Sequence, residues 1–185
     1  MRLLPSLVLL LAACSGPAPV PDAGSTPELP VDAGGPFDAG LADAGCVEAC
    51  ATTALTLTLR GRSAPFTRAQ HGLAPNDRFT VEAHFGGDPA CPTMTSPTPE
   101  RTVVIANLRH PMDGGAVTFA DGLRVTLFDF SQVLTSAPLE RATNARATPR
   151  FVSPGQLVSF ELEAIFDGGT LTGTFAAPHC SSLDG

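Results

Sequence analysis

Cysteine is the residue of this chain best suited to covalent chemistry, because a thiol can accept a lipid, form a disulfide or bind a soft metal ion. The chain has five cysteines in 185 residues. They are Cys14, Cys46, Cys50, Cys91 and Cys180. An odd number in a protein exported to an oxidising compartment indicates that one thiol has a separate use. Cys14 is set apart, because it directly follows an apolar run.

Histidines and one pair of carboxylates are the other candidates for chemistry. The histidines are His71, His84, His110 and His179, and none stands at metal-ligand spacing from another. We expect His84 and His110 to be solvated. Glu161 and Glu163 alternate along one predicted strand, about 7 Å apart, and we place them on its solvated face. An acid/base pair would instead need a cleft and separated pKa values.

Sequence motifs of known enzyme classes are absent from the chain. It has no serine-hydrolase elbow, no zinc-protease motif and no P-loop. We therefore predict no catalytic residues, no metal site, no cofactor and no enzymatic activity.

The N-terminus combines Arg2 with the apolar run LLPSLVLLLAA at 3–13. As a helix this run would be about 16 Å long, so it is too short to span a bilayer but has the length of a signal-peptide core. The sequence LAAC at 11–14 resembles the lipobox of bacterial lipoprotein precursors. The resemblance implies that residues 1–13 are a signal peptide and that Cys14 carries lipid, which anchors the chain to a membrane. The alternative is a plain secreted protein cleaved after Ala13.

The residue after the lipobox bears on localisation within the cell envelope. In the lipoprotein sorting pattern an Asp at this position favours the inner membrane. Ser15 stands there instead, so the resemblance implies a lipid-anchored protein with the outer membrane favoured.

Residues 14–45 contain the lipidated cysteine and a segment rich in Pro, Ala, Gly and Asp, in which the tripeptide DAG occurs four times at irregular spacing. Such a composition buries too little apolar surface to offset the entropy of ordering, so we predict a disordered tether. Calcium binding by its Asp residues is the alternative, but no oxygen-rich loop is present. The combination of lipobox, DAG-rich spacer and small β-domain resembles lipoproteins of high-GC Gram-negative bacteria, a resemblance that implies no particular activity.

The four remaining cysteines form an even set once Cys14 is assigned to lipid, and we predict two disulfides. If the first and last strands are antiparallel, the end of the last lies near the start of the first. We therefore expect Cys180 to pair with Cys46 or Cys50, and Cys91 with the other. A zinc site including His179 and free thiols are the alternatives, although paired zinc-knuckle spacing is missing.

From residue 51 onward the apolar residues recur with a period of two, which is typical of strands with one buried face. In 51–60, for example, Leu55, Leu57 and Leu59 share one face. The predicted strands are 51–60, 79–85, 101–108, 116–120, 123–130, 156–166 and 170–176. Asp121-Gly122 predicts a hairpin between 116–120 and 123–130, and 167–169 predicts another between the last two strands. The connection 131–155 contains only a weak helix candidate at 137–145.

About seven short strands separated by Gly, Pro and Asp turns predict an all-β fold in residues 46–185. The architecture we expect is an antiparallel β-sandwich, Ig-like or related, with a small barrel as the alternative.

Composition narrows the classes of partner. The net charge is −7, and residues 1–45 hold five of the acidic residues. The folded part is therefore only slightly acidic. It lacks the basic surface that is typical of a nucleic-acid-binding protein. Trp and Tyr are absent, which argues against carbohydrate binding and broad protein recognition. A patch for phosphate or an acidic partner is a weaker hypothesis, based on Arg60, Arg62, Arg68 and Arg78.

These features predict a lipid-anchored envelope protein whose β-domain binds or scaffolds something, with an envelope protein as a candidate partner. The alternatives are a structural subunit of an envelope assembly and an extracytoplasmic hydrolase.

Overall fold

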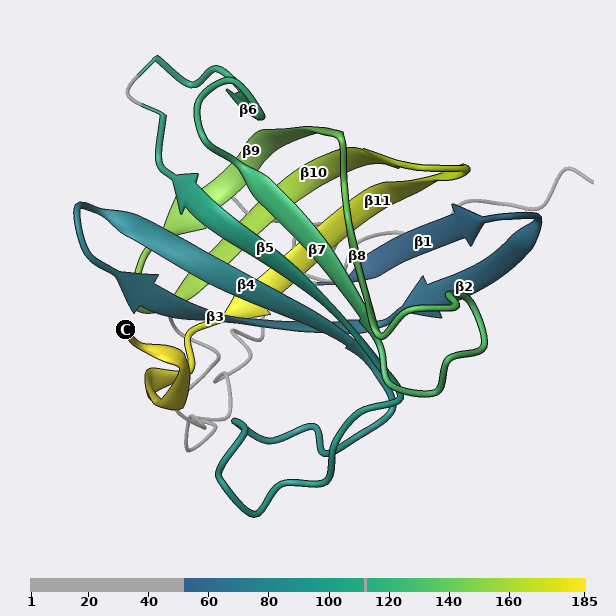
Figure 1. The fold of residues 1–185 in the computed structure, drawn as a ribbon. Coiled ribbons are helices and arrows are strands. Elements are labelled where there is room, and N and C mark those ends of the chain that lie inside the picture. The colour runs from purple at the N-terminus through teal and green to yellow at the C-terminus, as the bar shows by residue number, and fades with distance from the viewer. Residues whose placement is uncertain (1–51, 112) are drawn as a thin grey trace, which may run out of the picture. The chain divides into compact units, whose positions relative to one another are not determined.

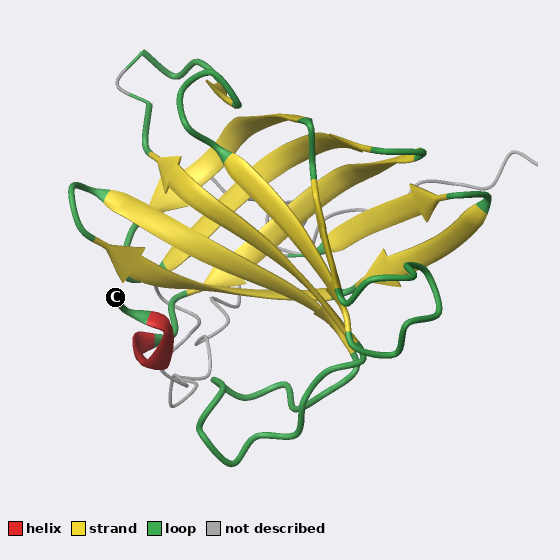
Figure 2. Ribbon diagram, viewed as in Figure 1, coloured by secondary structure: helices red, strands yellow, loops and turns green. Residues whose placement is uncertain are grey.

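A computed structural model describes residues 52–111 and 113–185, and β-strands dominate them (Figures 1 and 2). The strands are β1 (Ala54–Leu59), β2 (Arg62–Phe66), β3 (Arg68–Ala74), β4 (Arg78–Phe85), β5 (Arg101–Arg109), β6 (Val117–Thr118), β7 (Arg124–Asp129), β8 (Leu139–Arg141), β9 (Asn144–Ser153), β10 (Leu157–Phe166) and β11 (Gly169–Pro178). A 3-10 turn, η2 (Ser181–Leu183), follows β11. Within these two ranges, no helix has the length and apolarity that crossing a bilayer requires.

The strands form two antiparallel sheets that pack face to face, which confirms the predicted β-sandwich (Figure 1). One sheet has six strands in the order β2-β1-β11-β10-β9-β6, and the other has five in the order β3-β4-β5-β7-β8. The chain passes directly from one sheet to the other between β2 and β3 and again between β8 and β9. The first of these crossings joins two edge strands, whereas β9 lies one strand inside the edge strand β6. The short β6 adds two further crossings, from β5 and to β7.

The core lies between the sheets and follows from the alternation of apolar residues. In β1, Leu55, Leu57 and Leu59 are buried while the residues between them are exposed. Rings from both sheets meet in the middle: Phe79 of β4 lies 5.8 Å from Phe160 of β10, measured between ring centroids. Aromatic contacts of this kind stabilise a core beyond the area that they bury.

The hairpin between β10 and β11 forms as predicted, with Phe166 opposite Gly169. Gly168 in its turn has φ of +81°, a conformation that glycine adopts without steric cost. β1 also pairs antiparallel with β11, as expected of the first and last strands.

The prediction of a hairpin at Asp121-Gly122 was wrong. β6 pairs with β9 in the six-stranded sheet, whereas β7 belongs to the five-stranded sheet. The Asp121 carboxylate accepts hydrogen bonds from the Thr118 backbone N–H at 3.0 Å and from its hydroxyl at 2.7 Å. Asp121 therefore stabilises a loop that connects the two sheets. The Asp-Gly pair occurs in such loops as well as in hairpin turns, so the sequence does not distinguish the two.

The helix candidate at 137–145 was also wrong, because this segment contains β8 and the start of β9. In β9 the buried residues are the small Ala145 and Ala147, so the alternation between apolar and polar residues is weak in this strand. Residues 52–111 and 113–185 form eleven strands where the sequence predicted about seven, since β2, β3, β8 and β9 carry polar or small residues in place of a clear apolar alternation.

Candidate functional site

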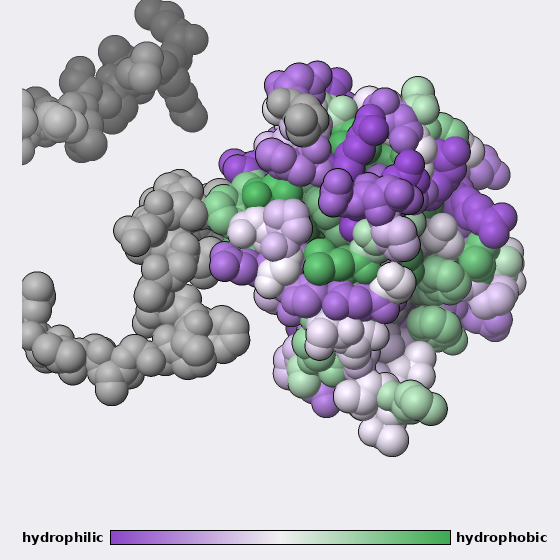
Figure 3. All heavy atoms as spheres, turned by 90° about the vertical axis from the view of Figure 1, so that its left-hand side faces the viewer, coloured by the Kyte–Doolittle hydropathy of each residue, from purple (hydrophilic) through white to green (hydrophobic). Residues whose placement is uncertain are grey.

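A pocket of about 640 Å³ lies at one open end of the sandwich, and we call it the open-end pocket. It is lined by Leu73, Ala74, Asn76, Asp77, Arg78, Phe79, Arg109, His110 and Pro154. These residues come from the β3–β4 turn, the end of β5 and the β9–β10 turn. Figure 3 looks onto this end of the molecule and shows a hydrophobic area bordered by hydrophilic side chains.

Irregular backbone at the ends of the strands shapes the open-end pocket. Asn76 and Asp77 in the β3–β4 turn have φ of +64° and +54°, which Asn and Asp tolerate better than most residues. The pairing of β4 with β5 shifts between Phe79 and Val81, where Asn107 of β5 has φ of +62°. A bulge of this kind bends a strand and redirects the side chains beyond it, so it determines where Arg109 lies.

Positive charge gathers at the rim of the open-end pocket. Arg78 and Arg109 are direct cross-strand partners, an arrangement that is unfavourable for like charges. Arg109 is compensated by Asp121, with 3.4 Å between nitrogen and oxygen. Arg78 donates to the amide oxygen of Asn107 at 3.2 Å, and it has no carboxylate partner among the described residues. The rim thus carries one guanidinium that forms no ion pair with a described residue, although the Asp77 carboxylate also lines the pocket.

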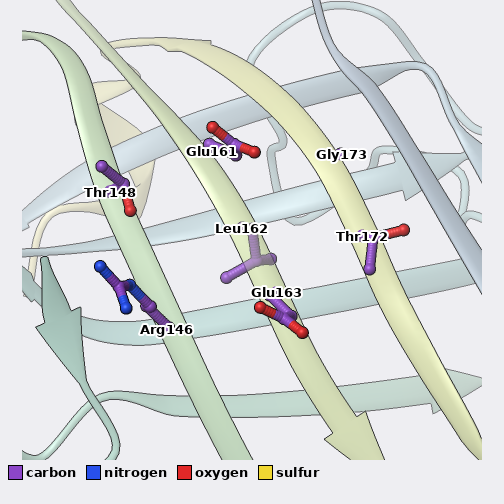
Figure 4. Close-up of a pocket in the computed structure, with 7 residues that line it drawn as sticks. All are labelled: Arg146, Thr148, Glu161, Leu162, Glu163, Thr172 and Gly173. Atoms are coloured by element: carbon purple, nitrogen blue, oxygen red, sulfur yellow. The ribbon is translucent and has the colours of Figure 1, made fainter.

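A second hollow, of about 330 Å³, lies on the outer face of the six-stranded sheet (Figure 4). We call it the sheet-face groove; its lining residues are Arg146, Thr148, Glu161, Leu162, Glu163, Thr172 and Gly173. Glu163 of β10 lies between Arg146 of β9 and Thr172 of β11, and the missing side chain of Gly173 leaves space in the groove. Glu161 and Glu163 are both exposed, as predicted for a solvated face.

His84 corrects a prediction, because it is buried with 8% of its surface exposed and is not solvated. Its Nδ1 lies 3.0 Å from the Thr102 hydroxyl, and its Nε2 lies 3.7 Å from a carboxylate oxygen of Glu82. Burial, with a smaller contribution from the charge of Arg68, lowers the pKa of His84 to about 4. Burial raises the pKa of Glu82. The loop between β4 and β5 folds over these strands and removes their outer face from water.

A hydroxyl, an imidazole and a carboxylate in contact resemble the parts of a nucleophilic triad. The loop leaves a hollow of only about 30 Å³ beside His84, which is the space of a water molecule. The loop is held in place because Gln70 donates to the carbonyl oxygens of Pro89 and Ala90 at 3.1 and 3.0 Å. This cluster is thus built like a packed polar layer, without space for a substrate.

The other histidines have separate environments. His71 is fully buried, and its Nδ1 lies 2.7 Å from the Ala177 carbonyl oxygen, while burial lowers its pKa. His179 lies 2.9 Å from Asp184, whose pKa is lowered mainly by the hydrogen bond from the Leu73 backbone N–H. His110 is exposed, as predicted.

Cys180 is paired with Cys91, with Cα atoms 5.6 Å apart, and not with Cys46 or Cys50 as expected. The end of β11 does lie beside the start of β1, since the Thr53 hydroxyl donates to the Ala176 carbonyl oxygen at 2.9 Å, but the chain continues past this point toward the other sheet. Its continuation lies beside β3, where the Cys180 N–H donates to the His71 carbonyl oxygen. This brings Cys180 to the β4–β5 loop that contains Cys91. The predicted lipid site Cys14 and the disulfide candidates Cys46 and Cys50 lie outside the described residues, as do the signal peptide and tether.

The four arginines of the hypothetical patch are not together. Arg60 pairs with Glu140 at 3.2 Å, Arg62 donates to the Val133 carbonyl oxygen, and Arg68 donates to the Gly86 carbonyl oxygen. Of the four, Arg78 alone lines the open-end pocket. The sequence did not single out Arg109, because it lies far from Arg78 along the chain and only the β4–β5 pairing brings them together.

The described residues hold no group of three or more His, Cys, Asp or Glu side chains arranged to bind a metal ion. Comparison with protein-family models, curated proteins and solved structures finds no significant match to the chain.

Proposed function

We propose that this protein is a lipid-anchored binding protein of the bacterial cell envelope that takes up a small ligand in its open-end pocket. The lipobox at 11–14 supports the anchor. The observation that carries the binding function is the pocket itself, a concave site with apolar residues and a few charged groups at its rim. Its volume of about 640 Å³ is in the usual range for small-molecule sites.

The other hollows support a binding function less well. The sheet-face groove lies on the outer face of one sheet and its carboxylates are exposed, so a ligand there would remain largely in water. The His84 cluster has no space for a substrate, which gives an extracytoplasmic hydrolase little support. A structural subunit would need an extended apolar patch. Among the described residues, the exposed large apolar side chains are Met94, Phe130, Val133, Leu139 and Ile165. Three of these belong to the single segment 130–139 after β7, and Met94 and Ile165 lie in other elements.

Native mass spectrometry of the full chain, extracted gently from bacterial envelopes, tests this function. We expect a bound small molecule that is lost in the Ala74→Glu variant, because the new carboxylate would lie in the pocket. The matched control is Ala54→Glu, an exposed position in β1 away from the pocket. Recovery of the chain in a fixed-stoichiometry complex with another envelope protein, without a small ligand, would favour the structural-subunit alternative.

A further inference from the structure

We propose that the ligand of the open-end pocket is an anionic amphiphile, a molecule with one carboxylate or phosphate group and an apolar chain. This inference rests on the proposed function, which makes the pocket a binding site. The pocket has two chemically different parts, and each of them recognises one part of such a molecule.

The apolar part is formed by the ends of β3 and β4 in the five-stranded sheet, together with one residue of the β9–β10 turn. Leu73 and Ala74 are half-buried, and Phe79 belongs to the core with 1% of its surface exposed. Pro154 reaches the same pocket from the β9–β10 turn. An alkyl chain placed here would pack on Leu73, Ala74 and Pro154, and the gain in free energy increases with the apolar area buried.

The charged part lies at the rim. Arg78 and Arg109 repel each other as direct cross-strand partners, and His110 lies next to Arg109. Asp121 compensates Arg109 alone. Asp77 is the acidic residue among those lining the pocket. An anion bound at Arg78 would relieve the repulsion and could accept two parallel hydrogen bonds from the guanidinium, a geometry that suits both carboxylate and phosphate.

A neutral or cationic ligand would lack this benefit. A small anion without an apolar chain would leave the apolar part unused. Acetate and inorganic phosphate should therefore bind weakly, and a neutral alcohol should bind less tightly than the carboxylate of the same chain length.

Isothermal titration calorimetry tests the ligand class on the full chain carrying Cys14→Ala, so that no lipid on Cys14 can compete for the pocket. The probes are decanoate and decyl phosphate, below the concentrations at which they form micelles, with decanol and acetate for comparison. We expect one site for decanoate or decyl phosphate, and the tighter of the two identifies the head group. Decanol should bind about tenfold more weakly, consistent with the loss of a charge-assisted contact.

Two variants locate the site. Arg78→Gln should weaken binding of the anionic probe about tenfold and leave decanol unchanged. Arg141→Gln is the matched control, because Arg141 is an exposed arginine of β8 that does not line the pocket. Equal affinities in the Arg78→Gln variant and the wild-type background, or equal affinities for decanoate and acetate, would overturn the proposal. If neither anionic probe binds while native mass spectrometry still finds a small ligand, the ligand class is wrong and the binding function stands.

Discussion

The position of Cys180, two residues after the end of β11, determines which cysteine it pairs with. The Cys91–Cys180 disulfide closes a segment with a sequence separation of 89, and in the chain-entropy model a loop of that length contributes about 4.6 kcal/mol to stability. The same disulfide holds the β4–β5 loop against the C-terminal segment, residues 179–185. If two disulfides form, the remaining pair is Cys46 with Cys50.

Peptide mapping without reduction tests this pairing directly. Trypsin cleaves the chain only after arginine, because the sequence contains no lysine. We expect peptide 79–101 to be linked to peptide 151–185, and Cys46 and Cys50 to be bridged within one peptide. A link from Cys180 to the peptide that holds Cys46 and Cys50 would contradict the structure.

The buried His84 gives stability a defined pH dependence. The pKa of His84 is about 4 in the folded chain, against an ordinary value of 6.5. Between these two pH values the unfolded chain therefore binds more protons than the folded chain does. Neutral His84 therefore makes its full contribution to the free energy of unfolding above pH 6.5. This contribution decreases as pH falls toward 4, by at most about 3 kcal/mol. His71 acts in the same direction, while the raised pKa of Glu82 opposes it.

Urea unfolding at pH 7 and at pH 4.5 measures this effect. We expect the His84→Gln variant to lose less stability between the two values than the wild type does. His110→Gln is the control, because His110 is exposed, and it should retain the wild-type difference. An unchanged difference in His84→Gln would show that protonation of His84 is not responsible.

At the level of secondary structure, strands with strong apolar alternation could be predicted from the sequence, and weakly alternating ones could not. β1 and β10 place apolar residues, mostly Leu or Phe, at every second position, so the buried face is evident. β9 buries Ala145 and Ala147, whose methyl groups give little contrast to their neighbours. β6 could not be assigned to its sheet, because a local turn signal at Asp121 does not show which distant strand receives Val117 and Thr118.

The pairing of β1 with β11 depends on a glycine that the sequence pattern does not reveal. Gly173 has φ of +132°, and a Cβ atom there would lie 2.1 Å from the Ala54 carbonyl oxygen. We expect Gly173→Ala to destabilise the fold by about 3 kcal/mol or more, because it adds a steric clash with the backbone to an unfavourable φ.

Gly122→Ala is the matched control for Gly173→Ala. Gly122 also has a positive φ, +95°, but a Cβ atom at this position would meet nothing within 4 Å. It should cost only about 1 kcal/mol from backbone strain. Thermal unfolding of both variants gives the comparison, and equal losses would show that close approach of β1 to Gly173 is not important.

At the level of the whole molecule, the fold could be predicted as a β-sandwich because many short alternating strands have few other ways to bury one face. The open-end pocket could not be predicted. Its two arginines lie on separate strands, and its apolar residues come from distant parts of the chain, so only the tertiary arrangement makes them neighbours. The pairing of Cys180 could not be predicted for the same reason, since it depends on the chain after β11 lying beside β3, where it meets the β4–β5 loop.

The lipid anchor is a whole-molecule prediction that rests on the sequence. We expect Cys14→Ala to move the protein from the membrane fraction to the soluble fraction, or to leave an unprocessed precursor, since the acceptor of the lipid is lost. Cell fractionation with metabolic labelling by a fatty acid measures this, and Cys50→Ala serves as a control for a cysteine outside the lipobox. Lipid incorporation that persists in Cys14→Ala would refute the anchor.

The proposed function depends on ligand binding at the open end of the sandwich. Amide chemical-shift mapping of the full chain carrying Cys14→Ala, during titration with decanoate, tests this most directly. We predict shifts concentrated at Leu73, Ala74, Arg78 and Arg109, on the two strand ends and the turn that form the pocket. Shifts confined to Glu161, Glu163 and Thr172 on the sheet face, or no localised shifts, would contradict it.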